Sequence, residues 1–284
     1  MTTSLNRAQG PGGASDAAGE PPYPRPERRA ALIVAHPGHE LRVHHWLERA
    51  RPSTLVLTDG SGRTGRSRLA STARTLARAG ARAGPVFGRF SDARIYEAML
   101  AGRSGAFVAL LDEIAFWLVS ERIDEVVCDA LEGYSTSHEL CGHLAGAACA
   151  LARRRSGRAV RLFDFTLTGP SDACPAELQP SAVRVSLDDA AVARKRAAAE
   201  AYVELRREVD EALARDGTSA PATEWLRPVT ERAGLTSDSA VVPFYETYGE
   251  AQVAAGHYRR VIRRDEHMLP LARALWAHAD AAVP

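Results

Sequence analysis

Three histidines in the sequence are spaced so that they could hold one metal ion. His36 and His39 come directly after the apolar run Ala31–Ala35, and His138 comes shortly after a second apolar run, Glu125–Asp129. Three protein ligands and one open position are typical of a catalytic zinc site. Such an ion lowers the pKa of a bound water and polarises a carbonyl group. The alternative for each histidine is a structural role, as a cap or a packed side chain at a strand end.

The elements that must position these histidines alternate between strand and helix. Short continuous apolar runs predict strands buried on both faces, and longer segments with a 3.6-residue period predict helices. We expect strands at 31–35, 54–58, 85–90, 125–129 and 160–165, and helices at 40–50, 67–81, 107–121 and 138–154. This alternation is typical of a Rossmann-like α/β fold, with a mainly parallel sheet and helices on both faces. Ligands of such sheets bind outside the carboxyl ends of the strands, where the histidines are predicted to lie.

The two ends of the chain differ in composition from this core. Residues 1–28 are rich in Gly, Pro, Ala and Ser and lack apolar periodicity, so we expect a disordered tail. The rest, 29–284, is expected to form a single domain. Its sheet core would occupy about 29–170, and a helical part about 180–284 would cap the sheet.

Helical periodicity in this C-terminal part falls into two regions. The first is a long charged helix predicted at 189–215, and the second covers 249–279. Pro270 lies inside the second region and is expected to interrupt it, because proline cannot donate a helical hydrogen bond.

Charge and hydropathy indicate which partners to expect. The net charge of the 284 residues is +1, so the chain lacks the positive surface of a nucleic-acid or anionic-membrane binder. No apolar run reaches the roughly 20 residues of a membrane helix, and no apolar segment of a signal peptide follows the N-terminal charges. The four cysteines form no CxxC pair, as expected for a reducing cytoplasm. We therefore expect a cytoplasmic protein with a small-molecule partner, and the sequence leaves homo-oligomerisation open.

The segments around the histidines resemble one known family. Ala35–Glu40 (AHPGHE) is similar to the AHPDDE signature of the LmbE-like, or PIG-L, zinc-dependent N-deacetylases, and it follows the first strand as theirs does. Leu57–Gly60 resembles the family's segment after the second strand. Tyr134–Gly142 resembles the family's GxHPDHxxxG region and keeps its final H-x-x-x-G spacing. The resemblance covers roughly residues 29–165.

This resemblance implies a set of metal ligands. His36 and His138 stand at ligand positions of the family, and His39 stands where the family has a ligand aspartate. Three histidines suit zinc, our first expectation, and they also accept Fe²⁺ or another divalent transition metal. Glu40 matches the family's glutamate and is expected to hold the turn and support the ligands.

Two acid–base positions of the family are changed in this chain. Gly38 stands where the family has its general base, an aspartate, and Ser135–His138 (STSH) replaces HPDH, so an assisting histidine is also missing. General acid–base catalysis is worth about 10²–10⁴-fold in rate. Either another residue supplies it, or the reaction differs, or catalysis has been lost.

Candidate replacements lie close to the predicted ligands in sequence. Glu132 is our candidate for the general base, and Tyr134 is our candidate donor to a developing oxyanion. Asp59, at the neighbouring strand end, and Glu139, directly after the third histidine, are further catalytic candidates, and Asp129 lies on the same loop as Glu132. For each carboxylate the alternative is a solvated position on a loop.

Two further segments carry functional residue types. His138 and His143 are separated by five residues, which places them about 140° apart on a helix and excludes the HExxH zinc motif. We therefore predict His143 on the outer face of its helix.

Pro243–Glu250 is aromatic and acidic; it is expected either to close the pocket and select substrate or to form a packed connector.

These patterns lead to three functional hypotheses. The first is a metal-dependent hydrolase of an N-acyl (amide) bond in a small polar molecule, which the resemblance suggests is an N-acetyl amino sugar or its conjugate. The second keeps the metal and changes the chemistry to an iron-dependent or lyase-type reaction. The third is a non-catalytic relative that binds a ligand or partner.

Overall fold

The computed structural model describes most of the chain outside its first residues. The described ranges are 28–62, 64–170, 172–216, 222–235 and 241–281. The predicted disordered tail lies outside them except for its last residue, and the single-domain division stays a prediction. Within the described ranges, no helix combines the length and apolar character needed to cross a bilayer.

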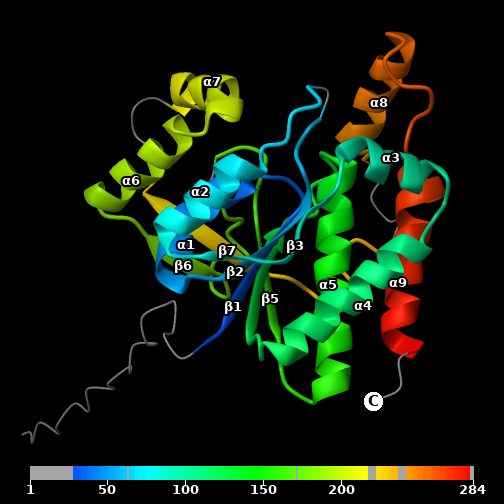
Figure 1. Cartoon of the computed structure of the whole chain (residues 1–284), viewed down its shortest axis with the longest axis horizontal. Helices are drawn as coiled ribbons and strands as arrows, with labels where there is room; N and C mark the ends of the chain where they lie inside the picture. Colours follow the sequence, from blue (N-terminus) through cyan, green and yellow to red (C-terminus); the bar gives the residue numbers. More distant parts are fainter. Residues whose placement is uncertain (1–27, 63, 171, 217–221, 236–240, 282–284) are drawn as a thin grey trace, which may run out of the picture.

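A seven-stranded sheet runs through the centre of the described chain (Figure 1). Its strands are β1 (Ala30–Val34), β2 (Ser53–Thr58), β3 (Arg82–Phe90), β4 (Glu125–Asp129), β5 (Arg161–Phe165), β6 (Val183–Ser186) and β7 (Thr223–Pro228). Their order is β3-β2-β1-β4-β5-β7-β6. The five strands from β3 to β5 are parallel, whereas β7 pairs antiparallel with both β5 and β6. The predicted Rossmann-like α/β fold is confirmed.

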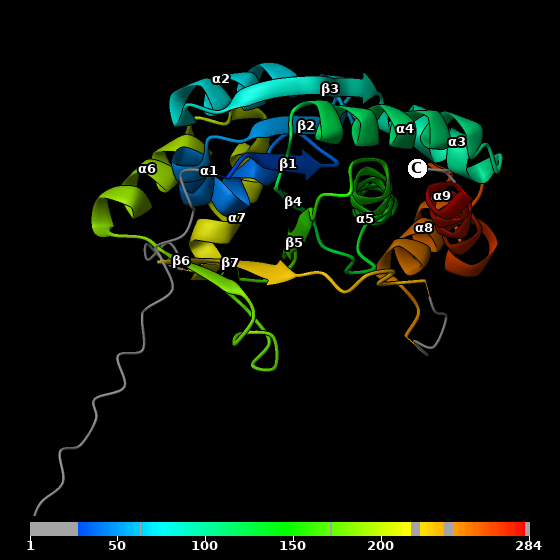
Figure 2. The same cartoon turned by 90° about the horizontal axis from the view of Figure 1, so that it is seen from below.

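Helices cover both faces of this sheet. Those in the described residues are α1 (His44–Ala50), α2 (Leu69–Ala79), α3 (Asp92–Leu100), α4 (Gly105–Ser120), α5 (Thr136–Ser156), α6 (Asp189–Glu200), α7 (Arg206–Asp216), α8 (Phe244–Ala254) and α9 (Leu269–Ala281). Figures 1 and 2 show α1, α2, α6 and α7 on one face and α4, α5 and α9 on the other. Short turns of other helix types occur at His39–Val43 (η1), Val203–Leu205 (η2) and Arg264–Met268 (η3).

The central strand β1 shows why the apolar runs predicted the sheet correctly. All five of its residues are buried, as expected for a parallel strand covered on both faces. Leu32 packs with Trp46 of α1 in one core cluster. Ile33 points to the opposite face and packs in the cluster that contains Leu111 of α4 and Leu275 of α9.

The C-terminal part departs from the prediction in its helices. The single helix predicted at 189–215 is wrong, because α6 ends at Glu200 and α7 begins at Arg206. Between them, Tyr202 turns inward and is buried, so packing overrides helical periodicity there. The interruption at Pro270 is also wrong. Pro270 lies in the first turn of α9, directly after the π-helical turn η3, so the helix type changes just before the proline while the helical path continues, and the break falls after α8 instead.

The C-terminal part also adds β6 and β7 to the sheet, which the sequence did not predict. In β7, Glu224 is fully buried and interrupts the apolar pattern of the strand. Its carboxylate accepts hydrogen bonds from the backbone N–H groups of His45 and Trp46 at the start of α1, and from Lys195 Nζ. Glu224 therefore joins the sheet edge to α1 and α6.

Candidate metal centre

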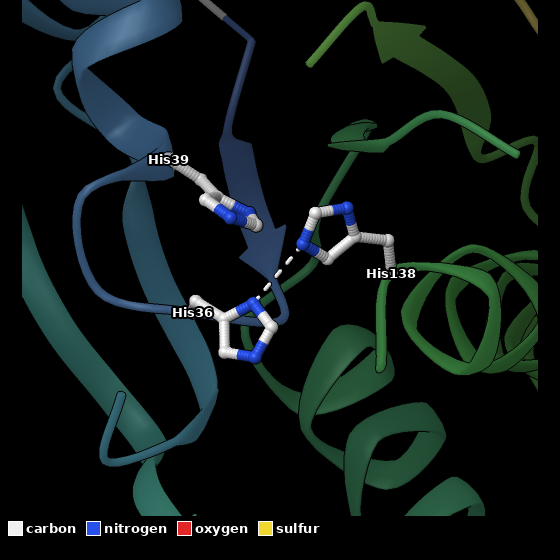
Figure 3. A group of neighbouring side chains, drawn as sticks. All are labelled: His36, His39 and His138. Carbon is white, nitrogen blue, oxygen red and sulfur yellow. Dashed lines mark hydrogen bonds between the residues drawn. The ribbon is translucent and has the colours of Figure 1, made fainter. Parts of the chain in front are cut away.

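The three histidines lie at the point where the strand order reverses. β1 pairs with β2 on one side and with β4 on the other, so the chain leaves β1 and β4 in opposite directions, and the gap between the two loops is where sheets of this kind bind ligands. His36 and His39 follow β1, and His138 lies in the first turn of α5, which follows β4. Figure 3 shows the three rings facing one another across this gap.

Distances between the rings suit a shared ion. His36 Nδ1 lies 3.1 Å from His138 Nε2. One nitrogen from each of His36, His39 and His138 lies within 4.8 Å of the others. Two nitrogens bound to one tetrahedral zinc at about 2.0–2.1 Å would lie roughly 3.3 Å apart. The structure thus brings together the three residues predicted as ligands, and their donor set fits a divalent transition metal.

Asp129, the last residue of β4, orients one of these rings. His39 Nδ1 lies 3.0 and 2.9 Å from the two carboxylate oxygens of Asp129, which leaves His39 Nε2 for the ion. Asp129 Oδ2 also accepts a hydrogen bond from Ala35 N at 2.8 Å. Burial raises the pKa of Asp129 to about 6, and burial together with the neighbouring His36 lowers the pKa of His39. A carboxylate behind a ligand histidine is the usual support of a metal site.

Asp92 lies beside a second ring, that of His36, and it was not among the residues predicted from the sequence. His36 Nε2 lies 2.9 Å from Asp92 Oδ1, while Asp92 Oδ2 accepts a hydrogen bond from Gly62 N at 2.6 Å. Burial alone would raise the pKa of Asp92, but the contact with His36 outweighs it and holds that pKa well below its usual range. The available signal was its place directly after the strand that ends at Phe90, at the same edge of the sheet.

The ring of His138 differs from the other two because its outer nitrogen, Nδ1, has no carboxylate beside it as a hydrogen-bond partner among the described residues. This nitrogen is buried, and no other described group is its hydrogen-bond partner either. Burial, followed by the two neighbouring histidines, lowers the pKa of His138 well below its usual value. A neutral imidazole is the form that binds a metal, so the surroundings of His138 favour ligation.

The turn between His36 and His39 is fixed by Glu40, as expected. Glu40 is fully buried, and its Oε2 accepts a hydrogen bond from Gly38 N at 2.7 Å. Burial raises the pKa of this carboxyl to about 7. Gly38 has a φ of +107°, in the region that favours glycine, so the turn needs a residue without a Cβ at this position.

The space beside Gly38 is filled by the C-terminal part of the chain. A Cβ on Gly38 would collide with Leu205 Cδ1 and would lie 3.7 Å from Tyr202 Cζ. Tyr202 is held in place because its hydroxyl lies 2.8 Å from Thr72 Oγ1 and donates to Arg68 O at 3.2 Å. The space beside position 38 is therefore filled by apolar packing from Leu205 and Tyr202.

Glu132, the predicted general base, is bonded to a neighbouring loop. Its carboxylate accepts hydrogen bonds from the hydroxyls of Thr166 and Thr168, at 2.7 and 2.9 Å. It also accepts from the backbone N–H groups of Leu167 and Thr168, at 3.0 and 3.1 Å. These bonds join the loop after β4 to the loop after β5 and occupy both oxygens.

The other two predicted carboxylates also shape loops. Glu139 Oε1 accepts hydrogen bonds from the backbone N–H groups of Glu132 and Gly133, at 2.9 and 2.8 Å, and burial raises its pKa to about 7. Asp59 Oδ1 accepts from Ser61 N at 2.9 Å. Among the described residues, the carboxylates that contact the ligand histidines are therefore those of Asp129 and Asp92.

Tyr134 is the predicted catalytic residue that lies beside a ligand. Its ring centroid is 6.0 Å from that of His138, and 47% of the residue's surface is exposed. It is therefore open to solvent beside His138, where it can contact a bound molecule.

His143 corrects one prediction on α5. The residue is buried and does not face outward, because the segment around Gly234 covers this side of the helix. A Cβ on Gly234 would lie 3.2 Å from His143 Cε1, and burial lowers the pKa of His143 to about 4. Cys141, on the same helix, is a buried thiol that donates to Ile33 O at 3.4 Å.

Comparison with known proteins gives matches to solved structures only. No family model matches the chain, and no curated protein matches it significantly. The crystal structure of the A40926 pseudoaglycone deacetylase Dbv21 is 19% identical, covers 72% of this chain and 98% of its own, and has a TM-score of 0.47. The zinc-inhibited form of teicoplanin deacetylase Orf2 is 14% identical, covers 74% and 100%, and has a TM-score of 0.47. The conserved protein TT1542 from Thermus thermophilus is 19% identical, covers 75% and 100%, and has a TM-score of 0.47. At these values the likeness does not establish an activity for this chain.

Proposed function

We propose that this protein is a metal-dependent hydrolase of an N-acyl (amide) bond in a small polar molecule, such as an N-acetyl amino sugar or its conjugate. The observation that supports the proposal is the convergence of His36, His39 and His138 at the switch point of the sheet. We expect Zn²⁺ to bind there; Fe²⁺ suits the same donors. When bound, the ion would supply a water of lowered pKa and polarise the carbonyl of the amide.

The chain's own residues would contribute orientation and substrate contact. Asp129 and Asp92 fix the tautomers of His39 and His36, so that one nitrogen of each ring is directed at the ion. Tyr134, exposed beside His138, is our proposed donor to the oxyanion. Because Glu132 is fully engaged in hydrogen bonds, we expect hydrolysis to lack most of the about 10²–10⁴-fold benefit of a general base.

Metal content tests this proposal first. The chain is purified without added metal, incubated with zinc and desalted, and bound metal is measured in wild type, His138→Ala and His257→Ala. His257 is an exposed histidine after α8 and serves as the matched control. One zinc per chain in wild type and the control, lost in His138→Ala, together with acetate release from N-acetyl amides, would support the proposal. Absence of bound zinc in wild type would refute it.

A second function is favoured by the closed position beside Gly38. Leu205 fills the place of the lost base, so the same metal ligands would suit an iron-dependent or lyase-type reaction, or metal-dependent binding without turnover. Iron in freshly purified protein, with an absorbance change on exposure to oxygen, would favour this second function. Zinc together with acetate release would exclude it.

A further inference from the structure

A ridge of exposed aromatic side chains begins at the candidate metal centre. It consists of Tyr134, Phe244 and Tyr248, whose exposed fractions are 47%, 50% and 36%. In the part of the chain that the structure describes, the other strongly exposed large aromatic residue is Phe116 on α4. Single exposed apolar residues are ordinary, whereas several gathered in one place mark a binding surface.

The ridge continues ring by ring from a metal ligand. Tyr134 lies next to His138, and the centroid of Phe244 is 5.1 Å from that of Tyr134, with the two ring planes only 7° apart. The centroid of Tyr248 is 5.8 Å from that of Phe244. Farther out, the Tyr258 ring lies 6.4 Å from Tyr248. A molecule held at the three histidines would therefore have its remaining part within reach of these rings.

Backbone contacts tie the ridge to the loop that carries the third histidine. Phe244 and Tyr248 are one turn apart on α8, the orange helix that projects beyond the other helices in Figure 1. At the start of α8, Tyr245 N donates to Gly133 O at 3.2 Å. One residue farther along α8, Glu246 Oε1 accepts a hydrogen bond from Arg264 N of η3 at 2.8 Å. The ridge is thus held in a fixed position relative to Tyr134 and His138.

The arrangement of the rings selects the chemistry of the occupant. Rings that face one another, as Tyr134 and Phe244 do, cover part of each other's faces, so edges make up a larger share of the ring surface that stays uncovered. Aromatic edges carry partial positive charge and faces carry partial negative charge, so a row of edges attracts the face of an incoming aromatic ring. An alkyl chain or a saturated ring has no such face and would gain from apolar contact alone.

We propose that the ridge binds an aromatic ring carried by the substrate close to its amide group, an inference that rests on the proposed function of the metal centre. The ring lies across Tyr134 and Phe244 while the amide reaches the three histidines. The segment Pro243–Glu250 thereby selects substrate, one of the two roles that its composition left open.

Three matched amides test this proposal on the zinc-loaded, full-length chain. N-benzylacetamide carries an aromatic ring, N-(cyclohexylmethyl)acetamide carries a saturated ring of similar size, and N-methylacetamide carries neither. Dissociation constants are measured by ligand-observed NMR titration, and acetate release is followed in the same samples. We expect the benzyl compound to bind about three- to tenfold more tightly than the cyclohexyl compound, as edge-to-face contacts predict.

Variants locate the preference on the ridge. In Phe244→Leu and Tyr248→Leu, which keep apolar side chains but remove a ring, the benzyl preference should fall to less than about twofold. Phe116→Leu, which removes a still more exposed ring on α4, should keep it. Circular dichroism and zinc content of each variant show that the fold and the metal centre are intact.

The two proposals fail in different ways. Equal binding of the benzyl and cyclohexyl compounds to wild type, or an undiminished preference in Phe244→Leu, would overturn the aromatic-ring proposal even if acetate is released. A benzyl preference that depends on Phe244 without acetate release would support the ridge and count against hydrolysis. Phe244-dependent sedimentation with phosphatidylglycerol vesicles, without any benzyl preference, would assign the ridge to a membrane surface and overturn the proposal.

Discussion

Leu205 occupies the space into which a side chain at position 38 would project. Gly38 lies in the turn between two of the metal-site histidines, and Leu205 lies in the short turn η2 between α6 and α7. The contact joins the C-terminal part of the chain to the metal centre. It also shows that any longer side chain at this position would have to displace Leu205.

Gly38→Asp should therefore destabilise the protein and fail to create a working base. The substitution forces a non-glycine residue to φ +107° and displaces Leu205, and we expect it to lower the free energy of unfolding by about 1–3 kcal/mol. Leu205→Ala in the same chain should return part of this loss, because it removes the collision and leaves the backbone strain. Urea unfolding of wild type, both single variants and the double variant gives the coupling free energy. Strictly additive effects would show that Leu205 does not limit position 38.

Asp129→Asn should weaken zinc binding while the fold persists. The amide keeps the shape of Asp129 and an acceptor for Ala35 N, but it no longer favours the His39 tautomer that presents Nε2. Loss of such a supporting carboxylate costs about 10- to 100-fold in metal affinity. Competition with a chelator measures the affinity, and Asp112→Asn, at a partly exposed carboxylate on α4, is the control. Equal zinc affinities in the two variants would contradict the assignment.

The central strands β1, β2 and β4 were predictable because they are buried on both faces. Runs such as Ala30–Val34 carry no polar residue, so a short apolar segment reveals the strand directly. β7 was not predictable in this way, since a buried Glu224 that pairs with Lys195 breaks its pattern. The break at Tyr202 was hidden for the opposite reason, since helical periodicity continues through it and only tertiary packing turns the residue inward.

The convergence of the three histidines and the support from Glu40 could be predicted, but the roles of Asp92 and Glu132 could not. His36, His39 and His138 follow strand ends, and the carboxyl ends of neighbouring parallel strands meet at one edge. Asp92 was missed because helix α3 was missed with it. Glu132 is the preferred candidate from the sequence because it lies near His138 and precedes a Gly-Tyr turn expected to face the site, whereas the loop at Thr166–Thr168 that binds its carboxylate comes from another strand end. Such contacts depend on loop paths that sequence periodicity does not describe.

Glu132→Gln should show whether this residue is a base or a support for the loop. The groups bonded to the Glu132 carboxylate are hydrogen-bond donors. The NH₂ of a glutamine in its place is also a donor, and it would face the N–H of Leu167 or the hydroxyl of Thr168 without an acceptor. We expect the free energy of unfolding to fall by about 1–3 kcal/mol. Turnover per folded molecule should stay unchanged, so that any loss of total activity matches the loss of folded protein. Thermal unfolding and acetate release measure the two effects, and Glu231→Gln, an exposed carboxylate paired with Arg153, is the control. A loss of turnover of about 100-fold or more at unchanged stability would identify Glu132 as the base.

His143 should make the metal-free protein less stable as the pH falls. Burial lowers its pKa from the ordinary value of 6.5 to about 4, so between these values the unfolded chain binds a proton that the folded chain does not. The contribution of His143 to the free energy of unfolding therefore rises with pH through this window. Above and below the window it does not change with pH. The contribution reaches roughly 3 kcal/mol across the window.

His39 and His138 also have lowered pKa values and act in the same direction, so the comparison must isolate His143. Urea unfolding of wild type and His143→Leu between about pH 4 and pH 8 makes this comparison. The slope of the free energy of unfolding against pH reports how many more protons the unfolded chain binds, and this number should be smaller by up to one in the variant. Equal slopes would mean that His143 is protonated as readily in the folded protein as in the unfolded chain, and that the segment around Gly234 does not keep it from water.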